Sequence, residues 1–345
     1  MPTATFLSFR LGGTDGVAVA AAAWQRAFAE LGWTTTTVAG EGPVDVVVPG
    51  LGLDDDEPPD AAELAAALAG ADLVVVENLL TIPMRLEASR VAAEVLRGRP
   101  AVLHHHDPPW QRARYRHVTE LPVDDPAWRH VTINELTRAE MAQRGFRATT
   151  IYPGFDPDPP AGDRAGTRAA LGVGPDEVLL LHPVRAIERK DVPTALRLAE
   201  ALGATYWLTG PAEEGYGPTL ERLLATTTAP VRHQPMPTVA DGYAACDAVL
   251  FPSTWEGFGH PPIEAAVHRR PVVVGPYPVA AELRALGFTW LAPDDVEGLR
   301  AAVAGRGAGS PEVLARNHAV ARRHLSPQAL RRSLAALLRD AGWGP

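Results

Sequence analysis

The chain has 345 residues, of which 46% are hydrophobic and 21% charged, a composition typical of a globular protein long enough for two domains. Its net charge of -9 argues against nucleic acid as the main partner, and its single cysteine, Cys246, excludes an internal disulfide and a multi-cysteine zinc site. The first residues lack a signal-peptide pattern and no apolar run approaches the ~20 residues of a membrane span, so we expect a cytoplasmic protein.

In the first half of the chain, short apolar runs alternate with alanine-rich stretches of helical periodicity. The pattern predicts strands at residues 3–9, 34–40, 72–78, 100–107, 130–135 and 148–154. It predicts helices at residues 16–33, 59–70, 87–99 and 136–146. Strands that are apolar throughout and alternate with helices indicate a parallel sheet covered on both faces.

The same alternation starts again after a segment rich in proline, aspartate and glycine. Strands are expected at residues 177–184, 205–211, 247–253 and 271–276, with helices from about residue 193, near 220 and near 264. We therefore predict an α/β protein with a first domain at 1–155, a linker at 156–166 and a second domain at 167–325. Both domains would be doubly wound and Rossmann-like, with their strand ends facing a common cleft.

A last helix is expected at residues 326–345. Ser326 suits the N-cap and Pro327 the first helical position. We expect this helix to pack back on the first domain.

A glycine-rich loop separates the first predicted strand from the first predicted helix. Gly12, Gly13 and Gly16 can expose backbone amides beside the positive end of a helix, which suits a phosphate. A tight turn without a ligand explains the same glycines equally well. The match to the G-x-G-x-x-G dinucleotide fingerprint is poor, so an NAD-dependent oxidoreductase is the least favoured class of enzyme.

Three consecutive histidines, His104–His106, end a predicted strand and are followed by Asp107. Neighbouring side chains of a strand alternate in direction, so the three imidazoles cannot share one face. A histidine at a strand end suits hydrogen bonding or proton transfer, whereas zinc needs three or four ligands from separate elements, so a metal site is less favoured. The acidic run at 53–60 is interpreted as a solvated linker. The loop that follows the histidines carries Arg112, Arg114 and Arg116.

Lys190 is the only lysine of the chain; of the 32 basic residues the other 31 are arginines. It lies with Arg185 in a predicted strand-to-helix loop of the second domain. A guanidinium and a compact ammonium, five positions apart, can hold a diphosphate from two sides. The alternative is a surface lysine without a function.

Two glutamates, Glu256 and Glu264, flank Gly257, Phe258 and Gly259 in front of a predicted helix. The glycines expose amides at the start of the helix, which suits an anion. Carboxylates beside an anion would repel it, so they are expected to face hydroxyl groups. A ligand with both phosphates and hydroxyls is a nucleotide sugar.

Taken in chain order, these motifs resemble the retaining glycosyltransferases of family 4, which have the GT-B fold. Glu256 and Glu264 match that family's two glutamates separated by seven residues. Segment 185–191 resembles its Arg-to-Lys diphosphate clamp, and segment 207–211 its glycine turn near the base. Segment 104–107 resembles its His-Asp loop, with His106 and Asp107 in the best register. The resemblance covers most of the chain in the right order.

The resemblance implies a role for each residue. Arg185 and Lys190 would hold the leaving diphosphate, together with the amides of Gly12, Gly13 and Gly16. The donor sugar would contact Glu256, Gly257, Phe258, Gly259 and His260. Glu264 would bind the ribose, and Gly210, Pro211 and His233 the base. The catalytic set would be His106, Glu256, Arg185 and Lys190. Asp107, Arg112 and Arg114 would lie on the acceptor side.

Two residues depart from the family's pattern. His260 stands where the family usually has an aliphatic residue, which leaves the donor sugar open. Arg270 stands where a glycine usually precedes the next strand, which indicates a different helix end.

The implied enzyme is a metal-independent hexosyltransferase that uses a UDP- or GDP-sugar as its donor and needs no cofactor. The arginines after His106 predict a small acceptor with a phosphate or carboxylate, or else they are solvated and balance the acidic segment 120–125. Neither a nucleic-acid partner nor membrane insertion is expected. Two alternatives stay open: a sugar-nucleotide epimerase of similar architecture, and a non-catalytic partner that binds nucleotide sugars.

Overall fold

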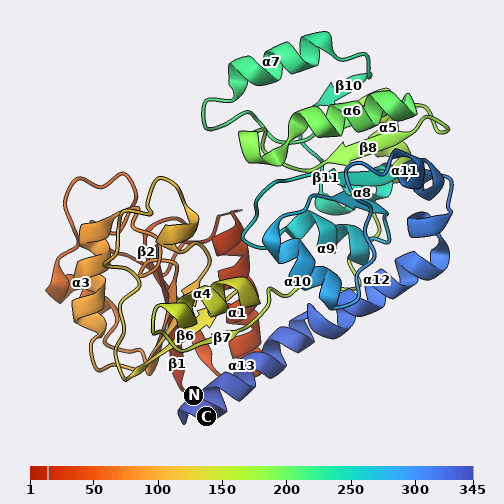
Figure 1. Cartoon of the computed structure of the whole chain (residues 1–345). Helices are drawn as coiled ribbons and strands as arrows, with labels where there is room; N and C mark the ends of the chain where they lie inside the picture. The colour runs from red at the N-terminus through yellow and green to blue at the C-terminus, as the bar shows by residue number, and fades with distance from the viewer. Residues whose placement is uncertain (14, 345) are drawn as a thin grey trace. The chain divides into compact units, whose positions relative to one another are not determined.

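The computed structural model describes residues 1–13 and 15–344, which form two compact units (Figure 1). The first unit comprises Met1–Gly154 together with the C-terminal segment from Pro327, and the second comprises Phe155–Ser326. Each unit has its own parallel sheet flanked by helices, which confirms the predicted α/β class.

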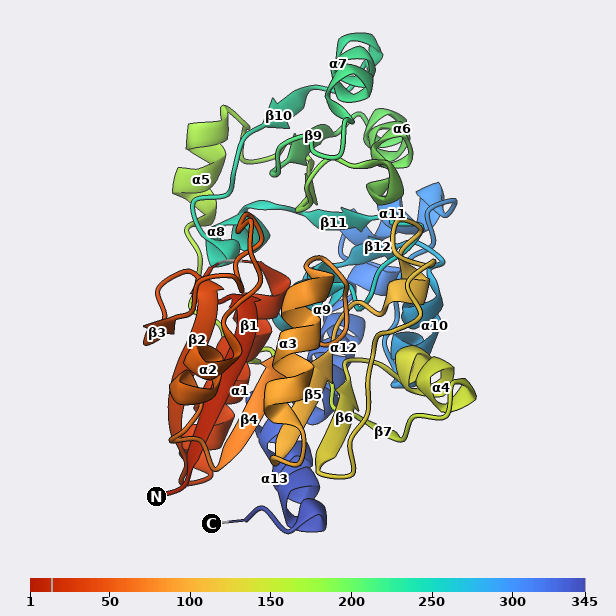
Figure 2. The same ribbon diagram turned by 90° about the vertical axis from the view of Figure 1, so that its left-hand side faces the viewer.

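The first unit contains seven parallel strands in the order β3-β2-β1-β4-β5-β6-β7 (Figure 2). The strands are β1 (Thr3–Arg10), β2 (Thr34–Glu41), β3 (Val46–Val47), β4 (Leu73–Glu77), β5 (Ala101–His105), β6 (Trp128–Thr132) and β7 (Ala148–Thr150). The helices are α1 (Gly16–Glu30), α2 (Ala61–Ala67), α3 (Leu86–Leu96), the short η1 (Pro109–Gln111), α4 (Glu135–Gln143) and α13 (Pro327–Ala341).

Helices cover both faces of this sheet. Successive residues of a strand point to opposite faces, so an apolar strand has side chains to bury on each of them. On one face, Phe6 and Val75 pack with Trp24 of α1 and Leu334 of α13. On the other face, Leu7 packs with Leu64 of α2, with Leu68 directly after α2, and with Ala92 and Leu96 of α3. Helix α13 is last in the chain, yet its buried leucines belong to the core of the first unit.

The second unit contains five parallel strands in the order β10-β9-β8-β11-β12. The strands are β8 (Leu179–His182), β9 (Thr205–Leu208), β10 (Val231–His233), β11 (Ala248–Phe251) and β12 (Val272–Val274). The helices are α5 (Arg164–Leu171), η2 (Glu188–Lys190), α6 (Val192–Leu202), α7 (Gly217–Thr226), α8 (Val239–Ala245), α9 (His260–Val267), α10 (Pro278–Ala285), α11 (Val296–Val303), η3 (Gly307–Gly309) and α12 (Pro311–His324).

The candidate site residues follow strands of these sheets. In a parallel sheet the carboxyl ends of all strands lie at one edge, where ligands of such folds bind. Gly12 follows β1 and His106 follows β5 in the first unit, whereas Lys190 follows β8 and Glu256 follows β11 in the second. Each unit therefore collects its candidate residues at one edge of its own sheet, and the common cleft stays a prediction.

Three features differ from the sequence-based expectations. The segment predicted as a linker is not irregular to its end, because α5 begins at Arg164 and Asp163 caps it by accepting a hydrogen bond from the amide of Gly166. The acidic run at 53–60 is not merely solvated: Asp55 binds the amides of Gly50 and Gly52. Strands β3 and β10 and helices α8, α10, α11 and α12 were not predicted. The last residue of the helix expected at 326–345 lies outside the described residues.

Across residues 1–13 and 15–344, no helix combines the length and the apolar character needed to cross a membrane.

Candidate functional site

The lone lysine forms a buried ion pair with one of the two predicted glutamates. Lys190 lies in the short helix η2, and its Nζ is 2.5 Å from Oε1 of Glu256. Both residues are less than a tenth exposed. Burial lowers the pKa of the Lys190 ammonium, and the charge of Glu256 opposes this effect. The structure thus joins the loop after β8 to the loop after β11 through opposite charges.

Arg189 is a second cation on the same carboxylate, and no sequence motif pointed to it. Its Nη1 donates to Oε2 of Glu256 at 2.7 Å and to the carbonyl of Trp255 at 3.0 Å. The amide of Thr254 in turn donates to the carbonyl of Arg189 at 2.9 Å. Arg185, the predicted partner of Lys190, instead pairs with Glu213 at 2.5 Å and is half exposed. Both oxygens of Glu256 therefore bind cations from η2, whereas Arg185 pairs with another carboxylate and acts on Lys190 only through its charge.

Glu264 is held by a tyrosine from helix α8. The hydroxyl of Tyr243 donates to Oε2 of Glu264 at 2.6 Å, and its ring stacks on His268 at 5.0 Å between centroids. Burial raises the pKa of Glu264, and the hydrogen bond from Tyr243 partly offsets it. Glu264, the predicted ribose-binding residue, is thus held in place by Tyr243, and burial disfavours its charged form.

The turn in front of α9 requires glycine at position 259. Gly259 is the N-cap of α9 with φ 95°, and a Cβ there would lie 2.2 Å from Oη of Tyr277. Pro261 and Pro262 in the first turn carry no N–H, so this helix start has fewer amide donors than an ordinary one. His260 packs edge-on against Phe155 with ring centroids 5.1 Å apart.

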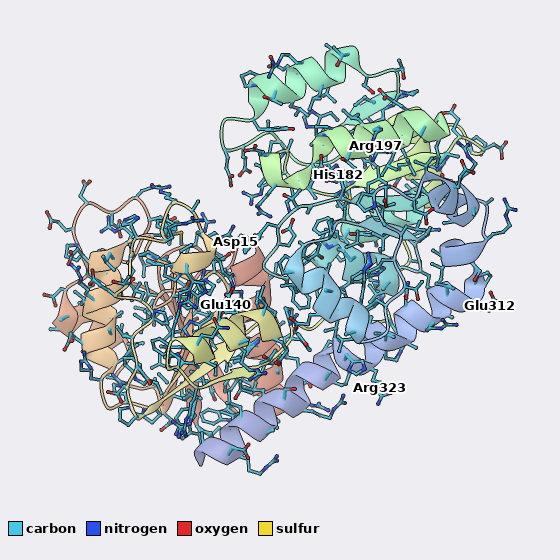
Figure 3. The ribbon with its side chains drawn as sticks, viewed as in Figure 1. Asp15, Glu140, His182, Arg197, Glu312 and Arg323 are labelled. Atoms are coloured by element: carbon cyan, nitrogen blue, oxygen red, sulfur yellow. The ribbon has the colours of Figure 1, made fainter. Side chains whose placement is uncertain are left out.

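Three polar atoms near this cluster are sealed from solvent without a hydrogen-bond partner in the described part of the chain. They are Nε2 of His182, Oγ of Ser253 and Oη of Tyr277. His182, labelled in Figure 3, ends β8; burial and the nearby charge of Lys190 lower its pKa to about 3, so its ring is neutral. Burial, with the charge of Glu256 adding to it, raises the pKa of Tyr277. Buried polar groups of this kind call for a water or ligand partner.

The residues predicted to bind the base lie together at the ends of β9 and β10. Nε2 of His233 bonds to the carbonyl of Gly210 at 2.9 Å, and the carbonyl of Pro211 accepts from the amide of Ala186 at 2.8 Å. A Cβ at Gly210 would lie 2.4 Å from the carbonyl oxygen of Val184, so glycine permits this close approach.

In the first unit, the predicted phosphate loop is partly occupied by its own carboxylate. Asp15 caps α1 and accepts from the amides of Val17 and Ala18 at 3.0 and 3.1 Å. Gly12 has φ 76°, and its Cα packs so closely on Pro43 that a Cβ would lie 2.5 Å from that ring. The residue between Gly13 and Asp15 lies outside the described residues. The phosphate-binding role of Gly12 and Gly13 stays a prediction, whereas the amides that follow Gly16 already bind a carboxylate.

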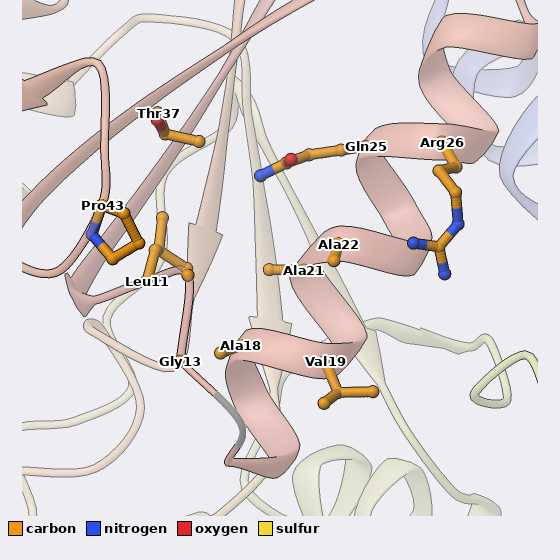
Figure 4. A pocket seen from close by; sticks show the side chains of 11 residues that line it. Leu11, Gly13, Ala18, Val19, Ala21, Ala22, Gln25, Arg26, Thr37 and Pro43 are labelled. Atoms are coloured by element: carbon orange, nitrogen blue, oxygen red, sulfur yellow. The ribbon is translucent and has the colours of Figure 1, made fainter. Parts of the chain in front are cut away.

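A pocket of about 320 Å³ lies beside this loop, between α1 and β2 (Figure 4). Small side chains of α1 form one wall, and Gln25 points toward Thr37 across it. Gly12, Gly13 and Pro43 close its end. The pocket is mainly apolar at α1 and has few polar groups.

The three histidines alternate as predicted. His104 Nδ1 and His106 Nε2 both lie 2.9 Å from Oε2 of Glu77, which ends the neighbouring strand β4. His105 points the other way and bonds to Nδ1 of His130 at 2.8 Å. Glu77, His104 and His106 each offer a ligand atom within 4.8 Å of the others, the spacing of a possible metal site. Glu77 was not predicted, because it ends a different strand from the one that carries the histidines.

Arg112, the first arginine after His106, is half-buried, whereas Arg114 and Arg116 are exposed, as the solvated alternative expects. Arg112 pairs with Asp107. Glu120 pairs with Arg90 at 2.8 Å, and Asp124 bonds to His130 at 3.0 Å. The half-buried ion pair of Asp107 and Arg112 therefore fixes the start of the loop.

Arg270, the departure from the family's pattern, has a structural role. Its Nε and Nη2 donate to the carbonyls of Tyr243 and Ala244 at 2.6 and 2.9 Å. These carbonyls lie at the end of α8, so a cation stabilises the end of that helix. The left-handed position usual for glycine at a helix end falls on Arg269, with φ 52°.

Comparison with known proteins begins with the second unit. Residues 219–305 match the family model described as glycosyl transferases group 1. This segment contains Tyr243, Glu256 and Glu264. The comparisons support a glycosyltransferase.

Two curated proteins are similar to parts of the chain. One is the O-antigen chain mannosyltransferase RfbU of Salmonella typhimurium, 39% identical over 61 residues, or 18% of this chain and 17% of the relative. The other is mannosylglucosylglycerate synthase of Petrotoga mobilis, 23% identical over 270 residues, or 63% of this chain and 62% of the relative. The chain thus spans less than two thirds of the length of each relative.

Solved structures share the fold over nearly the whole chain. HepE of Anabaena in complex with UDP-glucose has a TM-score of 0.76 at 19% identity. The match covers 98% of this chain and 99% of the HepE chain. Sucrose-phosphate synthase of Thermosynechococcus elongatus has a TM-score of 0.73 at 14% identity, with 99% of both chains covered. WaaG, a glycosyltransferase involved in lipopolysaccharide biosynthesis, has a TM-score of 0.68 at 17% identity. The match covers 97% of this chain and 99% of the WaaG chain. The chain has the GT-B fold.

Proposed function

We propose that the chain is a retaining glycosyltransferase of family 4 that moves a sugar from a nucleoside-diphosphate sugar to a small hydroxyl acceptor. The observation that carries the proposal is the buried contact of Lys190 and Arg189 with Glu256 at the strand-end edge of the second unit. Glu256 and Glu264 lie in the segment that matches glycosyl transferases group 1, and their spacing is that of the family's paired glutamates. The comparisons favour sugar transfer over the epimerase and over the non-catalytic partner.

The second unit would bind the donor. Lys190 and Arg185 would take the diphosphate, Glu264 the ribose hydroxyls, and the turn of Gly210 and His233 the base. A bound diphosphate would share the ammonium of Lys190 with Glu256. The oxygens of Glu256 could then also accept hydrogen bonds from sugar hydroxyls. The structures of HepE were solved with UDP-glucose and with UDP and glucose, which supports a nucleotide-sugar donor.

In the transfer, the bond between the anomeric carbon and the diphosphate oxygen breaks, and both electrons leave with the diphosphate. Lys190 and Arg185 would stabilise this charge more strongly as it develops than in the bound donor, which lowers the barrier. The acceptor oxygen forms the new bond on the same face of the sugar, and its proton passes to the departing phosphate oxygen. Because cations neutralise the diphosphate, we propose that the reaction needs no metal ion.

The acceptor would meet the first unit at the loop after β5. The ion pair of Asp107 and Arg112 fixes this loop, and Arg114 lies over the ring of Tyr115 at 5.3 Å. Guanidinium groups bind phosphate and carboxylate through paired hydrogen bonds, so an acceptor with such a group fits best. The product in the name of the Petrotoga relative contains glycerate, a carboxylate.

The test is a product screen by mass spectrometry. The full chain is incubated with UDP-glucose and GDP-mannose in turn, with neutral and anionic acceptors, and the anomeric configuration of any product is read by NMR. Transfer with retention, unchanged by EDTA, is expected. Loss of transfer on chelation and its return with Mg²⁺ or Mn²⁺ would contradict the metal-free reaction. Nucleotide binding without transfer or hydrolysis would instead support the hypothesis of a non-catalytic partner.

A matched pair of variants tests the acceptor. We expect Arg112→Gln and Arg114→Gln to raise the acceptor KM about tenfold through the loss of charged hydrogen bonds, while the donor KM stays constant. Arg222→Gln on the surface of α7 serves as the control. An unchanged acceptor KM, or a neutral acceptor, would show that these arginines are structural.

A further inference from the structure

Glu77 binds two imidazoles through a single oxygen. Oε2 lies 2.9 Å from Nδ1 of His104 and 2.9 Å from Nε2 of His106, and all three side chains are buried. Burial alone would raise the pKa of this carboxyl, but the charges of and hydrogen bonds from His104 and His106 outweigh it and bring the pKa down to about 2. Glu77 is therefore an ionised acceptor.

An ionised acceptor decides where the protons of the imidazoles lie. A carboxylate has no proton to donate, so each nitrogen that faces Oε2 must carry one. Burial lowers the pKa of His104, and a proton on its sealed Nε2 would have no acceptor among the described residues. His104 is then protonated on Nδ1 and bare on Nε2. By the same contact, His106 is protonated on Nε2.

A metal ion in this cluster fits less well than these protons. With the two N–H groups on Oε2, the only buried atoms of the cluster left without a partner are acceptors, Oε1 of Glu77 and Nε2 of His104, among the described residues. A metal on Nδ1 of His104 would force Nε2 to carry a proton, and among the described residues no group is placed to accept it. Metal-bound histidines almost always donate that second proton to a partner.

The backbone on either side of this contact is fixed. Asn78, next to Glu77, has φ 61°, and its Oδ1 accepts from the amides of His106 and Asp107 at 3.1 and 3.2 Å. Trp24 stacks on His104 at 4.2 Å between centroids. Within the described part of the chain, the other ring nitrogen of His106, Nδ1, makes no hydrogen bond and, unlike Nε2 of His104, is not sealed from solvent.

We propose that Glu77 is a positioning residue that fixes His106 in the Nε2–H tautomer, so that Nδ1 presents a lone pair to a hydroxyl group of the bound ligand. The identity of that hydroxyl rests on the proposed transferase function, whereas the tautomer does not. The assignment has a chemical consequence: His106 accepts a hydrogen bond from a sugar or acceptor hydroxyl and does not protonate the departing diphosphate.

A second histidine chain in the same unit provides the matched control. The hydroxyl of Thr81 bonds to Nδ1 of His105 at 2.6 Å, Nε2 of His105 to Nδ1 of His130, and Nε2 of His130 to Asp124 at 3.0 Å. Here too a carboxylate at one end sets the direction of every proton. Asp124→Asn therefore disturbs a similar chain without touching His106.

The test combines NMR of the ¹⁵N-labelled full chain with kinetics, and the signals of His106 are assigned from their loss in His106→Gln. In the wild type, Nε2 of His106 is expected to be protonated and Nδ1 bare. In Glu77→Gln, the side chain presents an amide NH2 group as well as an oxygen, so the contact no longer imposes a proton on Nε2 of His106. His106 then moves toward the Nδ1–H tautomer, and kcat/KM for transfer falls about tenfold or more.

Asp124→Asn is expected to keep the tautomer of His106 and the rate of transfer. A wild-type His106 with a protonated Nδ1 would overturn the proposal by itself, even if Glu77→Gln did not fold. Stoichiometric zinc that is lost in Glu77→Gln would also overturn it. An unchanged rate in Glu77→Gln with a switched tautomer would refute the role toward the ligand. If the chain transfers no sugar at all, the proposed function fails, and the spectra still decide the tautomer.

Discussion

At the scale of single residues, the second unit uses an ammonium where the rest of the chain uses guanidinium groups. Nζ of Lys190 lies 2.5 Å from Glu256 and 5.0 Å from the ring centroid of Phe251. The planar guanidinium of an arginine is larger and more weakly hydrated, and it requires a broader set of acceptors. The neighbouring Arg189 reaches the other oxygen of the same carboxylate from a less buried position. The two cations are therefore not interchangeable.

The first prediction concerns this lysine. We expect Lys190→Ala to lower kcat by about 10²- to 10³-fold, because one of the groups that stabilise the leaving charge is lost. Lys190→Arg should restore only part of the rate, since the guanidinium is larger than the ammonium that lies beside Glu256 and Phe251. Steady-state kinetics with the donor found in the product screen measures both effects. Arg222→Ala is the control, and wild-type turnover in Lys190→Ala would remove Lys190 from the diphosphate site.

The second prediction concerns Tyr243 and pH. Burial raises the pKa of Glu264, and ribose hydroxyls donate best to its ionised form, so donor binding should weaken as the pH falls through this raised pKa. Tyr243→Phe removes a hydrogen bond that lowers the pKa, so the weakening should begin at a higher pH. The donor KM measured across the acidic range tests this shift, with Tyr216→Phe as the control. Identical pH profiles of wild type and Tyr243→Phe would contradict it.

At the scale of secondary-structure elements, helix α8 links the end of α9 to the candidate site. Arg270, which follows α9, binds carbonyls at the end of α8, and Tyr243 of α8 binds Glu264 of α9. The two helices thus hold each other through one cation and one hydroxyl. Arg270, at a position where the family of the resemblance usually has glycine, thus connects the end of α9 to α8.

The third prediction tests this connection with two adjacent residues. Arg270→Ala removes two charged hydrogen bonds to α8, so we expect it to lower the free energy of unfolding by about 1.5–3 kcal/mol. Arg269→Gly relieves a left-handed backbone but makes the unfolded chain more flexible, so the free energy of unfolding should change by no more than about 1 kcal/mol. Urea denaturation compares the two. Equal stabilities of the two variants would argue against the role of Arg270.

At the scale of the whole molecule, the end of the chain returns to the unit that contains its beginning. The leucines of α13 lie in one core with Phe6, Trp24 and Phe28. Helix α13 also follows directly on the second unit, which ends at Ser326. The first unit therefore cannot complete its core without helix α13.

The fourth prediction uses this arrangement. Leu334 is fully buried, and Leu334→Ala should lower the stability of the first unit by about 2–5 kcal/mol. Hydrogen exchange followed by mass spectrometry should then show faster exchange in α1 and β1, more than three hundred positions earlier in the chain. Leu299→Ala in α11 should instead speed exchange within the second unit. Faster exchange confined to α13 itself in Leu334→Ala would contradict the shared core.

The sequence by itself determined the α/β class, the alternation of parallel strands and helices, and the loops that carry polar residues. These features depend on local patterns: apolar runs, helical periodicity, glycines and the position of a residue after a strand. For the same reason the sequence alone could name Glu256, Glu264 and Lys190 as candidates and predict the alternation of His104–His106. The short elements β3 and β10 escaped prediction because two or three residues carry too little periodicity.

Only the tertiary structure decided which charges meet. Glu77 lies 27 positions before His104, and Arg189 lies 67 positions before Glu256, so no local pattern connects them. Parallel strands place residues that are distant in sequence side by side at one edge, and burial then makes each of them depend on its partner. The residue types at the strand ends are thus known from the sequence. The packing of β4 against β5, and of the loop after β8 against the loop after β11, decided their partners, their protons and their charges.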